Sequence, residues 1–307
     1  MKNSRVTTSN SITDYVTVVI RSAGERTTEL CRVLACRQVP DENVFVIHEA
    51  PFVRAVEKTF EIGLHKNLPW TLTLDADIFL RAKAVHDIIS CVENLDKGVF
   101  EFHGMILDKL IITPKRGGPH LYRTEYLNEA LELIPREKVT GRPESQTFKK
   151  MAVRGYGLVR NDIVYGLHDY EQYYRDIYRK AYQHSQKHRK YVPYLQKAWS
   201  RLAHKDMDFR AALLGLRDGL KHEGEFEFDV NFFRNSAGLA GLRELPPEKE
   251  ELDLSLYKPE TVSRLILNFH APPEHKMYTR IKEDKPGCFR KLVSKGLSLF
   301  RAVGKEK

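Results

Sequence analysis

Two aspartates, Asp75 and Asp77, directly follow the apolar segment Trp70 to Leu74, which has the composition of a buried strand. Because alternate residues of an extended chain point to one side, we expect the two carboxylates to lie together. Neighbouring carboxylates repel each other unless a cation joins them. Oxygen ligands suit Mg²⁺ or Mn²⁺, whose other ligands are usually water and substrate phosphates. The pair therefore predicts a metal-bound diphosphate; the alternative is a solvated turn or a helix N-cap.

The flanking segments predict the elements that would position these aspartates. Short β-branched or apolar runs at 15–20, 44–47 and 70–74 alternate with helical patterns around Leu30 to Leu34, at 52–64 and at 84–95. Consecutive strand–helix units predict an α/β fold with a mostly parallel sheet and helices on both faces. Ligands of such sheets bind beyond the carboxyl ends of the strands, which is where the two aspartates lie.

The pattern changes after this unit. Apolar runs at 99–102 and 107–112 predict two further strands, and Gly-Gly-Pro at 117–119 predicts a loop. Residues 170–220 have a helical, tyrosine-rich pattern, and Pro246-Pro247 with the acids after it is typical of a linker. We therefore divide the chain into a flexible N-terminus (1–13), a catalytic domain (14–170), a basic helical extension (171–245), and a linker with a basic tail (246–307).

The order of elements and motifs resembles the glycosyltransferase family 2 type of GT-A fold, a Rossmann-like nucleotide-sugar domain with a D-x-D after an early strand. The resemblance covers roughly residues 14–170. Its parts are the first strand and loop, the second strand, Asp75-Ala-Asp77, the Gly117-Gly118 loop leading to Leu121-Tyr122-Arg123, and the run from Arg142 to Tyr156. The last run looks like the acidic motif that opens a helix in this family.

The resemblance implies a hexosyltransferase-type enzyme that moves a sugar from a nucleotide-diphosphate sugar to a glycan or lipid-linked acceptor. It implies inversion at the anomeric carbon, in surface polysaccharide or glycolipid synthesis. Asp75, Asp77 and His168 would bind Mn²⁺ or Mg²⁺. The donor would contact Arg21, Gly24, Glu49, Asp75 and Asp77, and the acceptor would contact Gly117, Gly118, Tyr122 and Arg123.

Such a transfer requires two kinds of group. A cation must neutralise the charge that grows on the leaving diphosphate, and a carboxylate must take the proton from the acceptor hydroxyl. We expect Glu144 to be this base, with Asp169 as the second choice because further acids follow His168. The alternative for Glu144 is a helix N-terminal acid stabilised by the helix dipole. The alternative for His168 is an ordinary surface or core imidazole.

The chain is basic, and its positive charge is concentrated in two segments. The 307 residues include 50 Lys and Arg against 41 Asp and Glu, a net charge of +9. Residues 175–205 have nine basic residues and one acid, and residues 277–307 have nine and three. Tyrosines recur at helical spacing around the first segment, which favours packing of this helix onto the catalytic domain. Cations among aromatic rings can also bind nucleic acid, but no RRM, KH or zinc-finger motif accompanies them.

The end of the chain and the cysteines bear on location. Residues 288–301 predict a helix with an apolar face and flanking basic residues, which suits either an anionic membrane surface or docking on its own domain. No run reaches the roughly 18 apolar residues of a membrane span, and the four cysteines form no CxxC pair. We expect a cytoplasmic protein, with peripheral contact to the inner face of a membrane if the terminal helix binds lipid.

Two other functions fit part of the pattern. A haloacid-dehalogenase-like phosphatase also has a strand-end Asp-x-Asp, but on its first strand and followed by Gly-Thr or Val-Thr, whereas Ile78-Phe79 follows here. A basic nucleic-acid-binding or scaffold protein would use the carboxylates only structurally. Two further motifs are assigned no site: Asp206-Met-Asp208 is predicted to be a solvated helix face, and the His184/His188 pair lies among too many cations for a metal.

Overall fold

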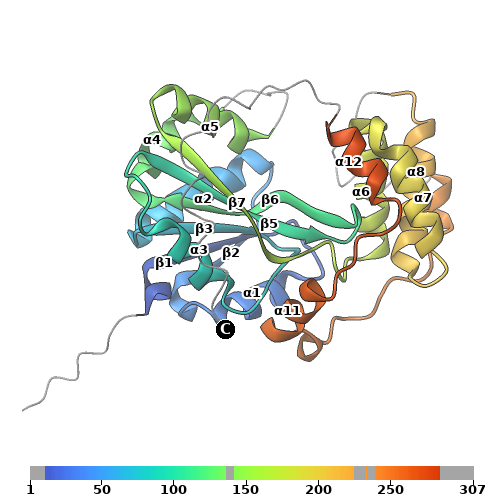
Figure 1. Ribbon diagram of the computed structural model, residues 1–307, viewed down its shortest axis with the longest axis horizontal. Helices are drawn as coiled ribbons and strands as arrows, with labels where there is room; N and C mark the ends of the chain where they lie inside the picture. The colour runs from blue at the N-terminus through green and yellow to red at the C-terminus, as the bar shows by residue number, and fades with distance from the viewer. Residues whose placement is uncertain (1–10, 136–141, 225–232, 234–238, 284–307) are drawn as a thin grey trace, which may run out of the picture.

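One mixed sheet forms the centre of the structure, with helices on both faces and a helical group at one end (Figure 1). The computed structural model describes residues 11–135, 142–224, 233 and 239–283. The strands are β1 (Val16–Arg21), β2 (Val44–Ile47), β3 (Trp70–Asp75), β4 (Ile78–Leu80), β5 (Val99–Asp108), β6 (Thr113–Arg123) and β7 (Gly157–His168). The helices are α1 (Thr28–Cys36), α2 (Phe52–Lys66), α3 (Ala84–Val92), α4 (Leu127–Leu133), α5 (Pro143–Val153), α6 (Tyr174–Lys187), α7 (Val192–Leu202), α8 (Met207–Lys221), α10 (Ala240–Arg243), α11 (Pro259–Leu267) and α12 (His275–Glu283).

The α/β class and the helices on both faces are confirmed, and the first three strands pair as predicted. The strand order is β2-β1-β3-β6-β5-β7-β4, and β1 is parallel to both β2 and β3. The rest of the sheet is mixed: β6 is antiparallel to β3 and β5, while β7 is parallel to β5 and antiparallel to β4. The sheet is thus parallel only in part, because β5 and β6 form a hairpin.

This hairpin differs from the sequence prediction in its details. The apolar run 107–112 is not a strand, because β5 ends at Asp108 and a turn leads to β6 at Thr113. The predicted loop at 117–119 is also wrong, since these residues lie inside β6. The register steps from His103 opposite His120 to Met105 opposite Arg116, so the glycine segment bulges out of the strand.

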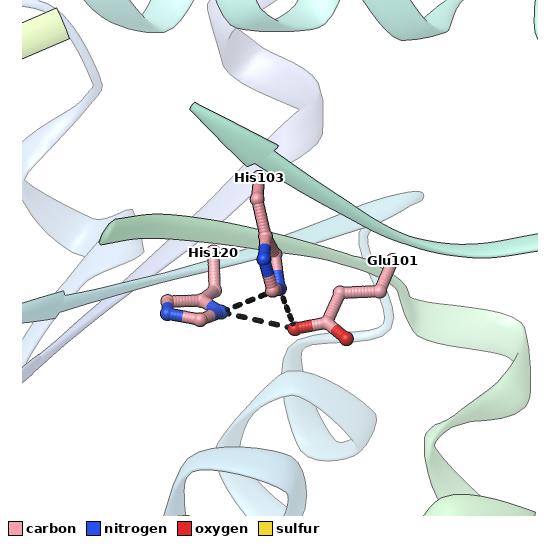
Figure 2. Close-up of side chains that lie close together, drawn as sticks. All are labelled: Glu101, His103 and His120. Carbon is pink, nitrogen blue, oxygen red and sulfur yellow. Dashed lines mark hydrogen bonds and ion pairs between the residues drawn. The ribbon is translucent and has the colours of Figure 1, made fainter. Parts of the chain in front are cut away.

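The two faces of the sheet have different chemistry. Tyr122 packs edge-on against Phe60 of α2, with 5.1 Å between the ring centroids, which identifies the face that α2 covers. Glu101 pairs directly opposite Tyr122, and His103 directly opposite His120, so these polar side chains share that face. Figure 2 shows Glu101, His103 and His120 converging on one side of the two strands.

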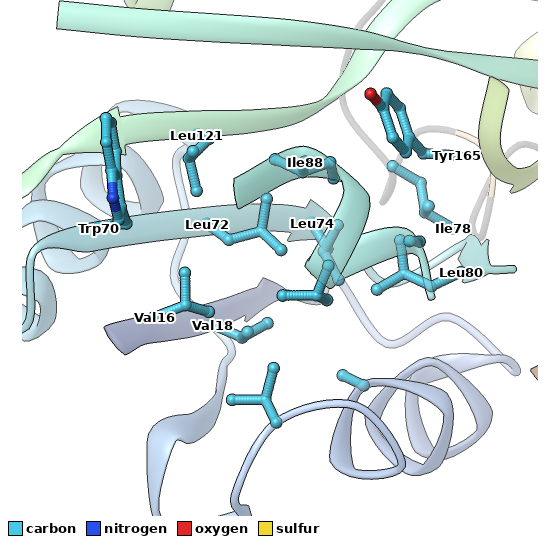
Figure 3. Close-up of a cluster of buried hydrophobic side chains, with 14 of the residues drawn as sticks. Val16, Val18, Trp70, Leu72, Leu74, Ile78, Leu80, Ile88, Leu121 and Tyr165 are labelled. Carbon is cyan, nitrogen blue, oxygen red and sulfur yellow. The ribbon is translucent and has the colours of Figure 1, made fainter. Parts of the chain in front are cut away.

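The opposite face is apolar. Val16 and Val18 of β1 and Leu72 and Leu74 of β3 pack with residues of α1 and α3 in the largest buried cluster (Figure 3). Alternating side chains therefore divide the sheet into an apolar face and a face that becomes polar toward the carboxyl ends of β1 and β3.

The predicted helical segment is confirmed as α6, α7 and α8, and buried aromatic side chains join it to the hairpin. Trp199 donates its indole N–H to the Leu110 carbonyl at 2.7 Å, and Tyr194 donates its hydroxyl to the Ile111 carbonyl at 2.8 Å. A Cβ on Gly215 would lie 2.1 Å from the Tyr178 carbonyl oxygen, so α8 can approach α6 this closely only with glycine there. The rings are structural, as predicted, and this packing fixes the position of α6.

The segment after the predicted linker contains more structure than its sequence pattern indicated. Helix α11 packs against β7 and β4 through buried Val262, and α12 contacts α7. Within the described part of the chain, none of the helices has the length and hydropathy needed to cross a bilayer. The predicted terminal helix at 288–301 lies outside the described residues.

Candidate functional site

The two aspartates of the D-x-D motif lie in separate ion-pair groups. The chain turns at residues 76–77, so the extended backbone on which the predicted common side of the two carboxylates depends is absent. Asp75 accepts hydrogen bonds from Arg21 Nε at 3.1 Å and Nη2 at 2.7 Å. Asp77, only 5% exposed, accepts one from Lys180 Nζ of α6 at 2.5 Å. Each carboxylate therefore has a cation supplied by this chain.

The Asp77 group combines side chains from the ends of three strands. His168 ends β7 and pairs with Ile78 of β4 and with Asp108 of β5. Its Nδ1 lies 2.8 Å from Asp108 Oδ2, while its Nε2 faces Asp77 Oδ1 at 3.5 Å. Asp169 follows at positive φ and also contacts Lys180. Asp77, His168 and Asp169 thus offer three potential metal ligand atoms within 4.8 Å of one another.

One carboxylate oxygen in this group accepts no hydrogen bond. Asp77 Oδ1 is buried and accepts no hydrogen bond from any described residue. A buried carboxylate oxygen without a hydrogen bond costs free energy unless a cation compensates it. It faces a histidine nitrogen whose ring is already oriented by Asp108, an arrangement common around protein-bound metals.

Charge compensation is strong within the group. Burial lowers the pKa of His168, but the adjacent Asp169 and Asp77 outweigh it and raise that pKa to about 10. Burial likewise opposes the charge of Asp169, yet His168 and Lys180 hold its pKa well below the usual value. Lys115 pairs with Asp108 at the edge of the group. Without a bound ion, the carboxylates are thus neutralised by protonated side chains.

The second group links Asp75 to Glu144 through Arg21. Glu144 follows Pro143 at the start of α5 and accepts a hydrogen bond from Arg21 Nη1 at 2.5 Å. The Tyr122 hydroxyl lies 3.4 Å from the same carboxylate oxygen. Burial alone would raise the pKa of Glu144, but the Arg21 charge lowers it. Glu144 is therefore an ionised carboxylate in a buried ion pair. Arg21, only 6% exposed, neutralises both Asp75 and Glu144.

The other predicted site residues are spread over the carboxyl edge and beyond it. Gly24, with φ of +90°, and exposed Glu49 lie in the loops after β1 and β2. The glycines 117 and 118 form the bulge of β6, where a Cβ on Gly118 would lie 2.8 Å from Ile78 of β4, next to Asp77. Gly24 and Glu49 thus lie at the carboxyl edge of the sheet, and Gly118 lies near Asp77.

The two predicted acceptor residues Tyr122 and Arg123 lie in different surroundings. Arg123 pairs opposite Trp70 at the start of β3, the end remote from Asp75, and its guanidinium lies over the Trp70 ring at 4.6 Å. Tyr122 is buried beneath α2 with its hydroxyl toward Glu144. Because β6 is antiparallel to β3, Arg123 lies away from the Asp77 group, whereas the Tyr122 hydroxyl lies beside Glu144.

Sequence reasoning missed Lys180 and Asp108. Lys180 belongs to a basic helix predicted to be binding surface, and Asp108 ends a run predicted to continue as a strand. The prediction for Asp208 is wrong: it is buried and pairs with Lys109 at 2.5 Å and with Lys249 at 2.7 Å, rather than lying on a solvated face. The sequence pattern did not indicate which of the many charged residues would be buried.

No protein-family model and no curated protein matches the chain. A glycosyltransferase involved in the glycosylation of the major capsid of PBCV-1 is similar at TM-score 0.36 and 12% identity, over 50% of this chain and 92% of that one. A mannosyltransferase from Pyrobaculum calidifontis, solved with GDP-Man and Mn²⁺, is similar at TM-score 0.37 and 14% identity, over 89% and 88%. The 4-diphosphocytidyl-2C-methyl-D-erythritol synthase of Anaerococcus prevotii has TM-score 0.36 and 14% identity, over 53% and 91%. These TM-scores are too low to support a functional argument.

Proposed function

We propose that this protein is a metal-dependent glycosyltransferase that uses a nucleotide-diphosphate sugar. The main support is the buried Asp77 Oδ1, which accepts no hydrogen bond from a described residue and faces His168 Nε2 at 3.5 Å at the carboxyl edge of the sheet. A carboxylate oxygen and an imidazole oriented through its other nitrogen fit a divalent cation. Metal binding would release the proton from His168, as it does wherever a ligand is protonated in the free protein.

In this proposal Asp77 and His168 hold Mn²⁺ or Mg²⁺, with Asp169 beside them. When bound, the ion would supply positive charge to the leaving diphosphate. Lys180 already reaches both Asp77 and Asp169, so it is positioned to bind a phosphate oxygen once the ion neutralises these acids. Arg21 keeps Asp75 in place, which makes Asp75 a neighbour of the metal group rather than a ligand.

We assign the proton-accepting role to Glu144. Arg21 maintains it as a carboxylate, and only one of its oxygens lies in that ion pair. Asp169 is less suited, because both His168 and Lys180 occupy its oxygens. A sugar hydroxyl near Glu144 could then donate its proton as the new bond forms. Inversion, a hexosyl donor and a lipid-linked acceptor remain part of the proposal through the family resemblance alone.

The alternatives have less support from the structure. The strand that a dehalogenase-like phosphatase would use, β1, ends at Arg21 instead of a nucleophilic aspartate. Four rings of the basic segment that could stack on nucleic-acid bases are buried: Tyr178, Tyr182, Tyr194 and Trp199.

A screen of nucleotide sugars tests the proposal. Nucleotide diphosphates at about 100 times their dissociation constant should stabilise the protein by about 2.7 kcal/mol, but only when Mn²⁺ is present. Thermal shift and donor hydrolysis, each with and without Mn²⁺, measure this. If no nucleotide diphosphate gives a metal-dependent response, the protein is not a glycosyltransferase of this kind.

Replacing Lys180 should increase metal affinity. Because Lys180 competes with a divalent ion for Asp77 and Asp169, we expect Lys180→Met to bind Mn²⁺ about tenfold more tightly in the absence of donor. Donor turnover should fall, since a cation near the leaving phosphate is lost. Titration calorimetry measures the affinity, and Lys187→Met, on the exposed side of the same helix, is the matched control. An unchanged Mn²⁺ affinity in Lys180→Met would mean that this lysine and the metal do not share carboxylates.

A further inference from the structure

A separate cluster of metal-binding side chains lies on the α2 face of the sheet. Glu101 and His103 come from β5, and His120 comes from β6 directly opposite His103. His120 Nδ1 lies 2.8 Å from His103 Nε2 and 2.9 Å from Glu101 Oε1, and the third contact joins His103 Nε2 to the same oxygen. Figure 2 shows these three atoms forming a closed triangle.

Protons cannot satisfy all three contacts of this triangle. Each imidazole nitrogen has one in-plane position, which holds either a proton or a lone pair. If both nitrogens donate to Glu101, their two N–H groups lie side by side across 2.8 Å with no acceptor between them. If only one nitrogen donates, the lone pair of the other nitrogen faces the lone pairs of the Glu101 oxygen, and that contact is repulsive. A cation at the centre would instead receive a lone pair from all three atoms at once.

The ligand set favours one class of ion. Two imidazoles and one carboxylate are a known set for Zn²⁺ when a fourth position is left to water. Zinc bonds of about 2.0–2.1 Å at tetrahedral angles place ligand atoms about 3.3 Å apart, so movements of about half an ångström would open the triangle sufficiently. The two histidine side chains are 16% and 12% exposed, so neither is completely buried.

A further polar atom lies next to this position. Thr73 of β3 pairs directly opposite His120, is only 1% exposed, and has a hydroxyl without a hydrogen-bond partner among the described residues. A metal-bound water would offer that hydroxyl a partner. The cluster thus has three converging ligands and an unpaired neighbour on the adjacent strand.

We propose that Glu101, His103 and His120 form a divalent-cation site that prefers Zn²⁺ and is distinct from the Asp77 group. The site does not depend on the proposed glycosyltransferase function, since none of its three residues belongs to the Asp77 group. It lies on the same face as the Arg21–Glu144 ion pair.

Metal binding to variants tests the site. Protein made without a polyhistidine tag is stripped with a chelator and dialysed against Co²⁺ or Zn²⁺, and bound metal per chain is measured together with the visible ligand-field absorption of Co²⁺. His103→Gln and His120→Gln should each lose one ion per chain, with affinity at that site reduced at least ~100-fold. His86→Gln, at an exposed histidine, should behave like the wild type.

Two further variants distinguish this proposal from the first. His168→Gln removes a ligand of the Asp77 group, so it should leave the cobalt spectrum of the new site intact even if no sugar is ever transferred. Glu101→Gln removes the carboxylate ligand but keeps the size of the side chain. It therefore tests the same site if a histidine variant fails to fold. The proposal is overturned if wild-type protein binds no Zn²⁺ outside the Asp77 group. It is equally overturned if a folded His103→Gln or Glu101→Gln protein keeps the wild-type stoichiometry and spectrum.

Discussion

Asp77→Asn should reduce metal-dependent turnover of the donor by roughly 10³-fold. The substitution keeps the shape of the side chain but removes the negative charge that faces both His168 and Lys180. A neutral amide oxygen is a poor ligand for a metal that must also hold a diphosphate, and the amide nitrogen would repel the lysine. Mn²⁺ affinity and donor hydrolysis should therefore fall together, which calorimetry and an assay for released nucleotide measure.

The matched control for this variant is Asp162→Asn. Asp162 is 81% exposed and pairs with Arg116 at the surface, so the same chemical change there should leave both measurements within twofold. Retained Mn²⁺-dependent hydrolysis in Asp77→Asn would remove this residue from the metal site. If both variants lost activity equally, the effect would come from net charge and not from the site.

Arg21→Met should destabilise the protein by about 3–5 kcal/mol at neutral pH. Arg21 neutralises Asp75 and Glu144, and its removal would leave two buried carboxylates without a cation. In the wild type the guanidinium lowers the pKa of both carboxyl groups, that of Asp75 to about 2. Without Arg21, burial would raise both pKa values. Urea unfolding at pH 7.5 measures the loss.

The pH dependence of this loss has a defined sign. In the wild type the two carboxyl groups have lowered pKa values, so their stabilising effect is present above their unfolded values, near 4. It is lost as the pH falls through the folded pKa values, which for Asp75 is about 2. In Arg21→Met the same groups are stabilised by protonation, so the difference from the wild type should shrink below about pH 5. Arg32→Met, at an exposed pair with Glu29, should cost less than about 1 kcal/mol at any pH. A gap that widens on acidification would contradict the buried ion-pair interpretation.

Local patterns in the sequence were sufficient for the first half of the sheet. The strands at 15–20, 44–47 and 70–74 and the helices between them were predicted to within two residues at each end. Each of these elements buries one face, and the burial appears in the sequence as periodic apolar residues. The same signal predicted α6 to α8. It failed at the β5–β6 hairpin, where the apolar run 107–112 continues through the turn and glycines 117 and 118 form a bulge rather than a loop.

The sequence by itself therefore determined the α/β class and the position of Asp75 and Asp77 at a strand end. Only the tertiary structure decided which charges compensate one another. Lys180 reaches Asp77 across 103 residues of sequence, and Arg21 reaches Glu144 across 123. The physical reason is that a buried carboxylate is stable only with a cation within hydrogen-bond distance, and that cation can come from any part of the chain. Hydrophobic periodicity cannot predict such an ion pair, because it indicates which face of one helix or strand is buried but not which element packs against that face.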